Sequence, residues 1–210
     1  MRRQRVRLVR RFTGGGTVIL DEDSILVSLI VRTADLEARS GAGAADGPGG
    51  AEADPPALFP RALMRWSEGF YRGVFAPLST GGAPFALSDS DYTFGPLKFG
   101  GNAQYITRGS FLHHTSFLWR FDRERMACLK HPPKEPEYRE GRAHGEFLTT
   151  LDAVAHSREA VLAAVEAQVA CTFGQVEAWD ADAVLEHAQD LQQGSPCLVQ
   201  SRVEPIPDDT

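Results

Sequence analysis

The chain contains little cysteine and no long hydrophobic run. Its cysteines, Cys128, Cys171 and Cys197, are odd in number and lie far apart, which argues against a disulfide framework and a zinc knuckle and favours a reducing compartment. No apolar stretch is long enough to cross a membrane, and no signal-peptide hydrophobic region is present. We therefore expect an intracellular protein with no membrane partner; the sequence does not distinguish cytoplasm, mitochondrion and plastid.

An excess of positive charge is also missing. The net charge is −6 and the isoelectric point is near 5.5, so bulk charge gives no reason to expect a nucleic-acid partner. Arginine is instead concentrated at the start, where it fills six of the first eleven positions. A chain of 210 residues can build one domain with a substantial core. We expect a monomer with one domain over residues 1–205 and a mobile tail after 205.

A glycine-rich stretch follows the arginines. Val6 and Leu8 alternate with arginines as in a strand, and residues 17–20 are β-branched and apolar, which predicts a second strand. The three glycines between them, 14–16, suit a backbone that approaches a ligand closely, and their N–H groups can face an anion. A tight hairpin beside surface arginines is the alternative. The stretch is neither a P-loop nor a dinucleotide fingerprint, because no Gly-Lys-Ser/Thr and no helix follow it.

The rest of the chain alternates between strand and helix patterns. Residues 25–31 form an apolar run that predicts a buried central strand, and residues 33–58 have too few large apolar side chains to order, which predicts a disordered insertion. Residues 130–146 predict an extended exposed crossing. Further helices are expected at 60–76, 122–129, 147–154, 157–170 and 182–191, and further strands at 85–87, 91–93, 105–106, 110–119 and 176–179. This order predicts the α+β class, with a mixed β-sheet backed by helices.

Several polar residues are candidates for a binding cleft. Lys98 stands before two glycines and can direct its ammonium at a carboxylate or phosphate, although a lone lysine is more often a solvated surface residue. Asn102 could orient a ligand or close a turn. His113 and His114 are adjacent on a strand and point to opposite faces, so they cannot share a metal, and no Cys, His or Asp accompanies them at metal spacing. We expect no metal site built by the protein.

Three blocks, in order, resemble those of the lipoate–protein ligases. Arg-Arg-Phe-Thr-Gly-Gly-Gly-Thr-Val (10–18) is similar to their Arg-Arg-x-Ser-Gly-Gly-Gly-Ala-Val block. Lys-Phe-Gly-Gly-Asn-Ala-Gln (98–104) and Leu-His-His-Thr-Ser-Phe-Leu (112–118) resemble their lysine block and their His-His strand. The crossing resembles a eukaryotic, plant- and alga-type branch of the biotin/lipoate A/B ligase family, through Lys130, Pro133, Lys134, Pro136, Tyr138 and Arg139.

The resemblance implies a biotin/lipoate ligase fold, like a class II synthetase, and an activity. Such enzymes activate lipoate or octanoate with ATP, with Mg²⁺ expected, and pass the acyl group to a lysine of a lipoyl-domain acceptor protein. Lys98 would be the catalytic residue, in contact with the acyl carboxylate or mixed anhydride. Substrate and nucleotide would be bound by Arg11, Gly14, Gly15, Gly16, Thr17, Val18, Ile19, Asn102 and His114.

The sequence departs from the family pattern in places. Thr13 and Thr17 replace Ser and Ala, and Thr115-Ser116 stands where Gly-Thr is usual. The chain begins almost at the glycine block, so we expect an N-terminally truncated member. An acyl-carrier-dependent octanoyl or lipoyl transferase would need a cysteine in the cleft, and residues 110–118 offer none. A noncatalytic acyl- or nucleotide-binding homologue is the other alternative, and the sequence does not choose among lipoate, octanoate and biotin.

Overall fold

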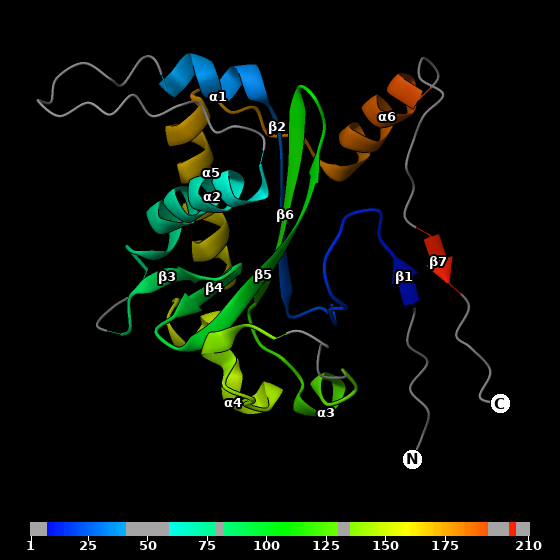
Figure 1. Ribbon diagram of the computed structural model, residues 1–210. Helices are drawn as coiled ribbons and strands as arrows, with labels where there is room; N and C mark the ends of the chain where they lie inside the picture. The colour runs from blue at the N-terminus through cyan, green and yellow to red at the C-terminus, as the bar shows by residue number, and fades with distance from the viewer. Residues whose placement is uncertain (1–7, 41–58, 79–81, 130–134, 193–201, 205–210) are drawn as a thin grey trace, which may run out of the picture. The chain divides into compact units, whose positions relative to one another are not determined.

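The computed structural model describes residues 8–40, 59–78, 82–129, 135–192 and 202–204 (Figure 1). It contains two compact units. The larger runs from Gly15 to Gly174, and the smaller combines Met1–Gly14 with Gln175–Thr210. No helix among the described residues is long and apolar enough to cross a membrane.

A five-stranded sheet organises the larger unit (Figure 1). Its order is β2-β6-β5-β4-β3, and each neighbouring pair is antiparallel. The strands are β2 (Ser24–Arg32), β3 (Phe85–Ser88), β4 (Asp91–Phe94), β5 (Leu97–Ile106) and β6 (Ser110–Leu118). One parallel bridge among the described residues joins Lys98 to Leu148. The predicted α+β class, with a sheet backed by helices, is confirmed.

Strand β2 lies at the edge of the sheet, so the prediction of a buried central strand at 25–31 is wrong. Its side chains alternate: Ile25, Leu29 and Val31 are buried, whereas Leu26 is 49% and Ile30 is 79% exposed. An apolar run without polar alternation indicates a strand covered on both faces. Here the run instead places Leu26 and Ile30 on an exposed face of the sheet.

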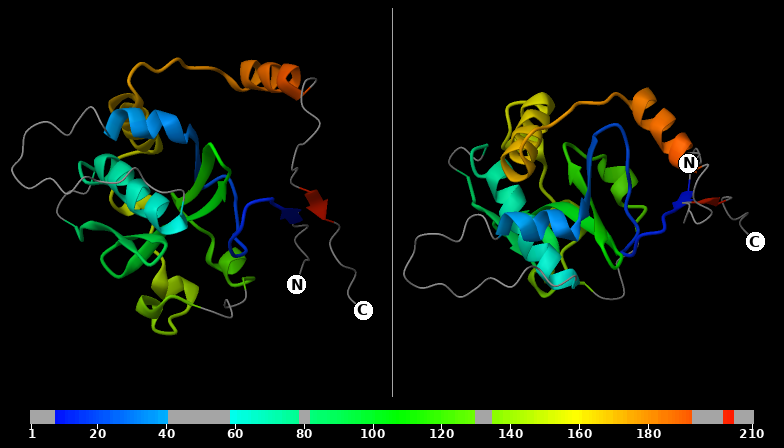
Figure 2. Two further views of the ribbon diagram at one scale, coloured as in Figure 1. Left: turned by 45° about the horizontal axis from the view of Figure 1, so that its top comes forward. Right: turned by 90° about the horizontal axis from the view of Figure 1, so that it is seen from above.

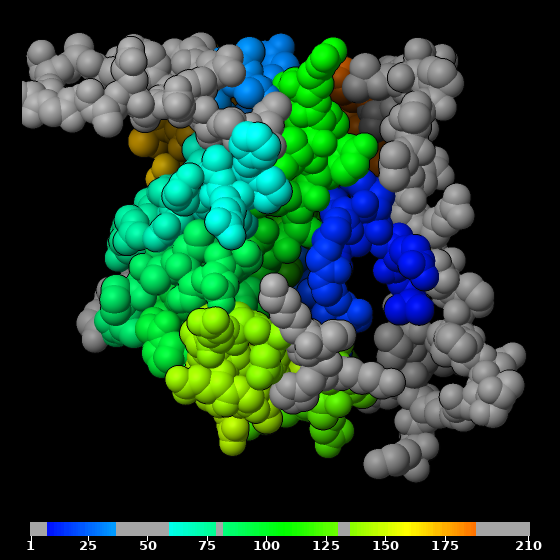
Figure 3. Space-filling model, in the orientation of Figure 1, coloured from blue at the N-terminus to red at the C-terminus, as the bar shows by residue number. Residues whose placement is uncertain are grey.

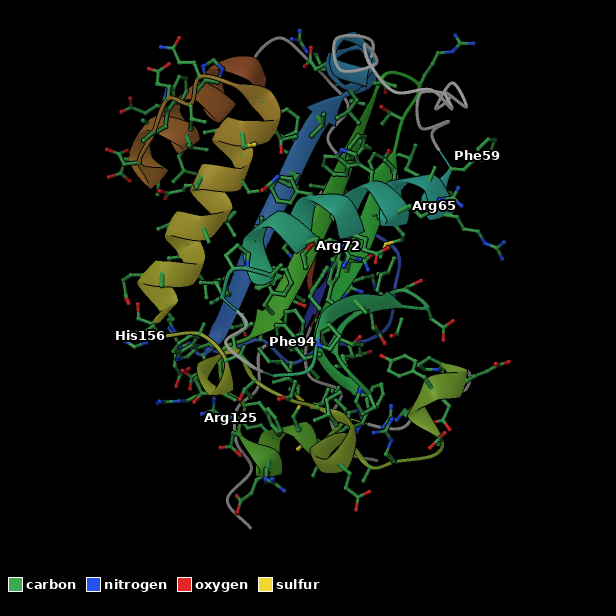
Figure 4. All side chains as sticks on the ribbon, turned by 90° about the vertical axis from the view of Figure 1, so that its left-hand side faces the viewer. Phe59, Arg65, Arg72, Phe94, Arg125 and His156 are labelled. Atoms are coloured by element: carbon green, nitrogen blue, oxygen red, sulfur yellow. The ribbon has the colours of Figure 1, made fainter. Side chains whose placement is uncertain are left out.

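Helices cover the other face of the sheet. The two views of Figure 2 show α2 (Pro60–Phe75) and α5 (Arg158–Phe173) on the same side, as does Figure 4, which looks onto them. Pro60 stands in the first turn of α2, where its missing N–H removes no helix bond. Ser157 caps α5, its hydroxyl accepting from the Ala160 N–H. Both starts match the sequence prediction.

The insertion expected at 33–58 is in part a helix. Helix α1 (Thr33–Ser40) follows β2 directly, and its Leu36 is buried in the core. Residues 41–58 lie outside the described part of the chain, so the rest of the prediction is not tested.

The core between helices and sheet is mainly aromatic. Tyr71 and Phe75 of α2 meet Phe99 of β5 and Phe117 of β6, and all four are fully buried. Burying a side chain of this size contributes roughly 1.5–3 kcal/mol. Gly100 is required here, because a Cβ at that position would lie 2.5 Å from the Phe117 ring. Of the two adjacent glycines in the lysine block, Gly100 is therefore needed for packing against Phe117.

Short elements follow the sheet. They are α3 (Arg123–Met126), the 3₁₀ turns η1 (Glu137–Arg139) and η2 (Leu151–Ala153), and α4 (His144–Phe147). Asp122 caps α3 as expected, but α3 ends at Met126 rather than Leu129. The predicted extended exposed crossing is wrong over residues 135–146, since these form η1 and begin α4, and Arg139 is buried. Residues 147–154 are not one helix, because an extended Leu148 separates α4 from η2.

Among its described residues, the smaller unit contains one strand pair and one helix. Strand β1 (Leu8–Arg10) pairs antiparallel with β7 (Arg202–Glu204), and α6 (Ala181–Gln192) matches the helix expected there. The strands predicted at 17–20 and 176–179 are absent, so the glycine stretch does not join two paired strands. The tail after 205 lies outside the described residues.

Candidate functional site

The site is built on the sheet face opposite α2 and α5, which we call the outer face. Cross-strand partners share a face, so the register assigns residues to it. Ser28 is opposite His114, and His114 is opposite Ala103. By the same register the outer face carries Leu26, Ile30, Gly101, Tyr105, Leu112 and Ser116. It is therefore an apolar surface with a few polar groups.

Lys98 brings a cation to this face. It lies within β5, close to the start of the strand. Its Nζ is 2.7 Å from Asp91 Oδ1, and its side chain is 28% exposed. A Cβ built on Gly101 would lie 3.4 Å from the same Nζ, so the ammonium lies directly over Gly101. Gly101 leaves the outer face open beside the charge.

The backbone of Lys98 is held as firmly as its side chain. Its carbonyl accepts a hydrogen bond of 2.8 Å from the Thr149 N–H, next to the parallel bridge to Leu148. On the neighbouring strand, Thr93 is its register partner. The side chain of Lys98 is therefore held by an ion pair with Asp91, and its backbone is held by a hydrogen bond from Thr149.

The partner carboxylate has a second contact that sequence reasoning missed. Tyr138 of η1 donates from its hydroxyl to Asp91 Oδ2 over 2.9 Å. Burial and the negative Asp91 raise the pKa of Tyr138, so its hydroxyl stays protonated and donates. Asp91 therefore contacts Lys98 with one oxygen and Tyr138 with the other. Sequence spacing could not reveal this, because Tyr138 is far from Asp91 along the chain.

The two other sheet residues predicted for the site differ in their contacts. His114 lies on the outer face with its Nδ1 2.7 Å from the Ser28 hydroxyl. Asn102 donates to the Ser90 carbonyl over 2.7 Å and thereby holds the β3–β4 turn. This contact agrees with the alternative in which Asn102 closes a turn.

His113 points the other way and lies in the core, as strand alternation requires. Tyr92 donates to Ser67, which donates to the Met64 carbonyl, so the Tyr92 oxygen is left to accept from His113 Nε2. His113 Nδ1 then accepts from the Gln104 amide. The hydrogen bonds assign a neutral imidazole with its proton on Nε2. Burial, and to a smaller extent the neighbouring His114, lowers the pKa of His113 to about 4.

The glycine stretch is divided between the two units. In the smaller unit, Arg11 donates to the Gly14 carbonyl over 3.2 Å. In the larger unit, Gly15 has φ of 112°, a conformation that favours glycine, whereas a Cβ at Gly16 would meet nothing within 4 Å. Thr17, Val18 and Ile19 follow as irregular backbone. The structure therefore places Lys98 and His114 on the outer face of one sheet, and it places Asn102, whose partner is Thr115, on the helix-covered face. Arg11 and Gly14 belong to the smaller unit.

Within the described ranges no group of three or more His, Cys, Asp and Glu side chains could hold a metal ion. Cys128 is exposed after α3 and Cys171 is exposed on α5, so neither lies on a strand of the sheet. Cys197 lies outside the described residues.

Comparisons with known proteins agree with this architecture. The model of the lipoyl protein ligase A/B catalytic domain family matches residues 64–174, which is more than half of the chain. A Plasmodium falciparum protein named inactive lipoate–protein ligase 2 is 26% identical over 184 residues, which cover 74% of this chain and 44% of that protein. The chain thus spans less than half the length of this curated relative.

Solved structures share the fold. A crystal structure of lipoate–protein ligase A bound with ATP gives a TM-score of 0.61 at 20% identity, covering 89% of this chain and 67% of that one. The structure of protein Ta0514 from T. acidophilum with bound lipoic acid gives 0.56 at 18% identity, with the same coverage. A bipartite lipoate protein ligase from Thermoplasma acidophilum, studied with its E2 lipoyl domain, gives 0.58 at 20% identity over 89% of this chain and 66% of that one.

Proposed function

Because this chain belongs to the lipoyl protein ligase A/B catalytic domain family, we propose that it is an ATP-dependent lipoate–protein ligase. It activates lipoate or octanoate with ATP and Mg²⁺ and transfers the acyl group to a lysine of a lipoyl-domain protein. The observation that carries the proposal is the Lys98 ammonium lying over Gly101 on an apolar sheet face. The family's solved members with ATP and with lipoic acid support the choice of substrates.

The outer face suits an acyl substrate with one charged end. Leu26 and Ile30 of β2 and Tyr105 of β5 are exposed apolar groups that can cover a hydrocarbon chain. Among contacts with described residues, the ion pair with Asp91 uses one of the three N–H donors of Lys98. The remaining donors can bind the acid's carboxylate. His114, hydrogen-bonded to Ser28, can contact the substrate from the centre of the face.

The nucleotide is assigned to the glycine stretch. Arg11 and the N–H groups of Gly14, Gly15 and Gly16 bind phosphate oxygens, and Thr17, Val18 and Ile19 line the nucleotide and acyl site. Asn102 is given no substrate contact, because its amide donates to the Ser90 carbonyl and its register partner Thr115 faces the helices. We infer that Mg²⁺ enters with ATP, since the described residues offer no metal-binding group of three or more ligands.

The reaction has two steps. The acid's carboxylate attacks the α-phosphorus of ATP, which joins acyl and adenylyl groups and releases pyrophosphate. The neutral amine of the acceptor lysine then attacks the acyl carbonyl, an amide forms, the amine loses a proton, and AMP leaves. Negative charge gathers at phosphorus and at the carbonyl oxygen, and Lys98 offsets it in a geometry already fixed by Asp91 and Thr149.

A noncatalytic acyl- or nucleotide-binding homologue is the second candidate. The P. falciparum relative, which is named an inactive ligase, favours it. This candidate uses the same face and the same Lys98 for binding but transfers no acyl group. The transferase alternative has less support, because neither Cys128 nor Cys171 lies on a strand of the sheet.

Incubating the full chain with ATP, Mg²⁺, lipoate or octanoate, and an apo lipoyl domain tests the proposal by mass spectrometry of the acceptor. We expect a mass gain on one acceptor lysine that requires ATP. Lys98→Ala abolishes it without unfolding the chain, whereas Arg65→Ala, at an exposed position of α2 labelled in Figure 4, leaves it intact. An unchanged transfer rate in Lys98→Ala contradicts the assignment of this residue.

The same assay separates the candidates. Gain only from an acylated carrier protein supports the transferase. No gain from either donor, with lipoate or ATP still bound, supports the noncatalytic homologue and rejects the ligase.

A further inference from the structure

Residues 135–149, which we call the segment after the sheet, are hydrogen-bonded to the β4–β5 hairpin at three points. Tyr138 donates to the Asp91 carboxylate, Arg142 Nη2 donates to the Pro96 carbonyl over 3.2 Å, and the Thr149 N–H donates to Lys98. Figure 3 shows the segment, in yellow-green, against the end of the molecule where β3 and β4 lie. The three acceptors are the Pro96 carbonyl in the turn before β5, the Lys98 carbonyl near the start of β5, and the carboxylate of Asp91.

The segment is itself rigid around one aromatic ring. Phe147 is 2% exposed and lies under Tyr138, with ring centroids 5.2 Å apart. The guanidiniums of Arg139 and Arg142 lie 5.0 and 5.4 Å from the same ring. Each of these arginines donates its Nε–H to the carbonyl of the other, and Arg142 also donates to the Tyr138 carbonyl over 2.6 Å. The backbone of Tyr138 is therefore held in place.

The Asp91 carboxylate is held at both of its oxygens. One carboxylate oxygen meets Lys98 and the other meets Tyr138, so rotation of the carboxylate would break both contacts. Lys98 has four rotatable side-chain bonds and depends on that carboxylate for the direction of its ammonium. Its three-donor head can hold Asp91 and still bind an anion over Gly101.

We propose that Tyr138 is a positioning residue for Lys98, acting through Asp91. The proposal rests on the proposed function for its kinetic consequence, but its structural content concerns this chain alone. Tyr138 fixes the carboxylate, the carboxylate fixes the ammonium, and the ammonium then stands where the acyl carboxylate or acyl phosphate arrives. Tyr138 does not touch the substrate.

Tyr138→Phe tests the hydrogen bond to Asp91 alone, because it removes the hydroxyl and keeps the ring packed on Phe147. Tyr71→Phe is the matched control, since it removes a buried hydroxyl that donates to Thr115 on the helix-covered side of the sheet. Two readouts are used. The first is the single-turnover rate of acyl transfer, together with the Kd for lipoate. The second is the rate at which an amine-reactive acetylating reagent modifies Lys98, with Lys130 and Lys134 as internal references.

We expect Tyr138→Phe to slow the single-turnover step about tenfold with the lipoate Kd changed less than about twofold. Acetylation of Lys98 should accelerate several-fold, and Tyr71→Phe should change neither readout. Asp91→Asn should give the same pattern, and the double variant should be no worse than the worse single variant, because both act through one contact.

The two proposals fail in different ways. If the chain transfers no acyl group, the acetylation test still decides the role of Tyr138. Unchanged acetylation of Lys98 in Tyr138→Phe overturns the positioning role, whatever the activity. Additive losses in the double variant overturn it as well.

Discussion

At the residue scale, His113 gives the clearest dependence on pH. Its imidazole is buried and neutral, and every hydrogen bond around it agrees with one tautomer. In the folded chain its pKa is lowered to about 4, below the ordinary value of 6.5. The unfolded chain therefore binds a proton first as the pH falls, and folding stability is lost below about pH 6.5 and down to about pH 4.

We predict that the free energy of unfolding falls by about 2 kcal/mol through this residue between about pH 7 and pH 5. Denaturant titrations at both pH values measure it. His113→Gln should lower stability at neutral pH and flatten the acid slope, whereas His156→Asn, at an exposed position, should keep the slope. An equal slope in His113→Gln would show that other groups cause the acid loss.

The two adjacent glycines of β5 should respond differently to alanine. In Gly100→Ala the new Cβ meets the fully buried Phe117 ring at 2.5 Å, so the ring must move and stability should fall by about 1–3 kcal/mol. In Gly101→Ala the nearest atom is Lys98 Nζ at 3.4 Å, so the fold should keep its stability. Thermal unfolding of both variants checks this, and equal losses would contradict the packing account.

Single residues show where sequence reasoning works. Lys98 could be found from its neighbouring glycines and its resemblance to a family block, and His114 from strand alternation. Asp91 and Tyr138 could not, because the contact between them depends on where a later segment folds back onto the hairpin. Gly100 was noted only as a glycine that follows Lys98, and the Phe117 ring beside it reveals its packing role.

At the scale of elements, the helices were the most predictable. Helix α2 has apolar side chains at helical spacing and a proline in its first turn, and α5 begins after a capping serine; both were expected within a few residues of their observed ends. Strand β2 was predicted as a strand, but it was expected in the centre of the sheet and lies at its edge. The apolar run 25–31 does not show which of its two faces is exposed. Residues 135–146 were read as extended since their composition hides the packing of Phe147.

Helix α5 provides a test of local stability. The Ser157 hydroxyl accepts from the Ala160 N–H over 3.1 Å, and α5 contacts α2 over the sheet. We predict that Ser157→Ala lowers the free energy of unfolding by about 1 kcal/mol. Urea titration followed by circular dichroism measures it, with Ser90→Ala at an exposed turn as the control. A loss no larger than that of Ser90→Ala would mean that the cap contributes nothing.

At the scale of the whole molecule, the larger unit contains the sheet, the helical layer and Lys98, and the family match falls within it. The smaller unit contains Arg11 and Gly14. That residues 1–205 act as one domain remains a prediction. The family was recognisable from three short blocks in order, because they carry the residues of the expected site, whereas the division of the chain into two units follows from no local pattern.

The central claim is that Lys98 on the outer face binds the charged end of an activated acyl group. Calorimetric titration with a hydrolysis-resistant lipoyl-adenylate analogue tests it most directly, since it needs neither turnover nor an acceptor. We predict that the parent chain and Arg65→Ala bind the analogue with equal affinity, and that Lys98→Ala binds it at least about tenfold more weakly. Equal affinities of Lys98→Ala and the parent, or no binding by the parent, would contradict the account.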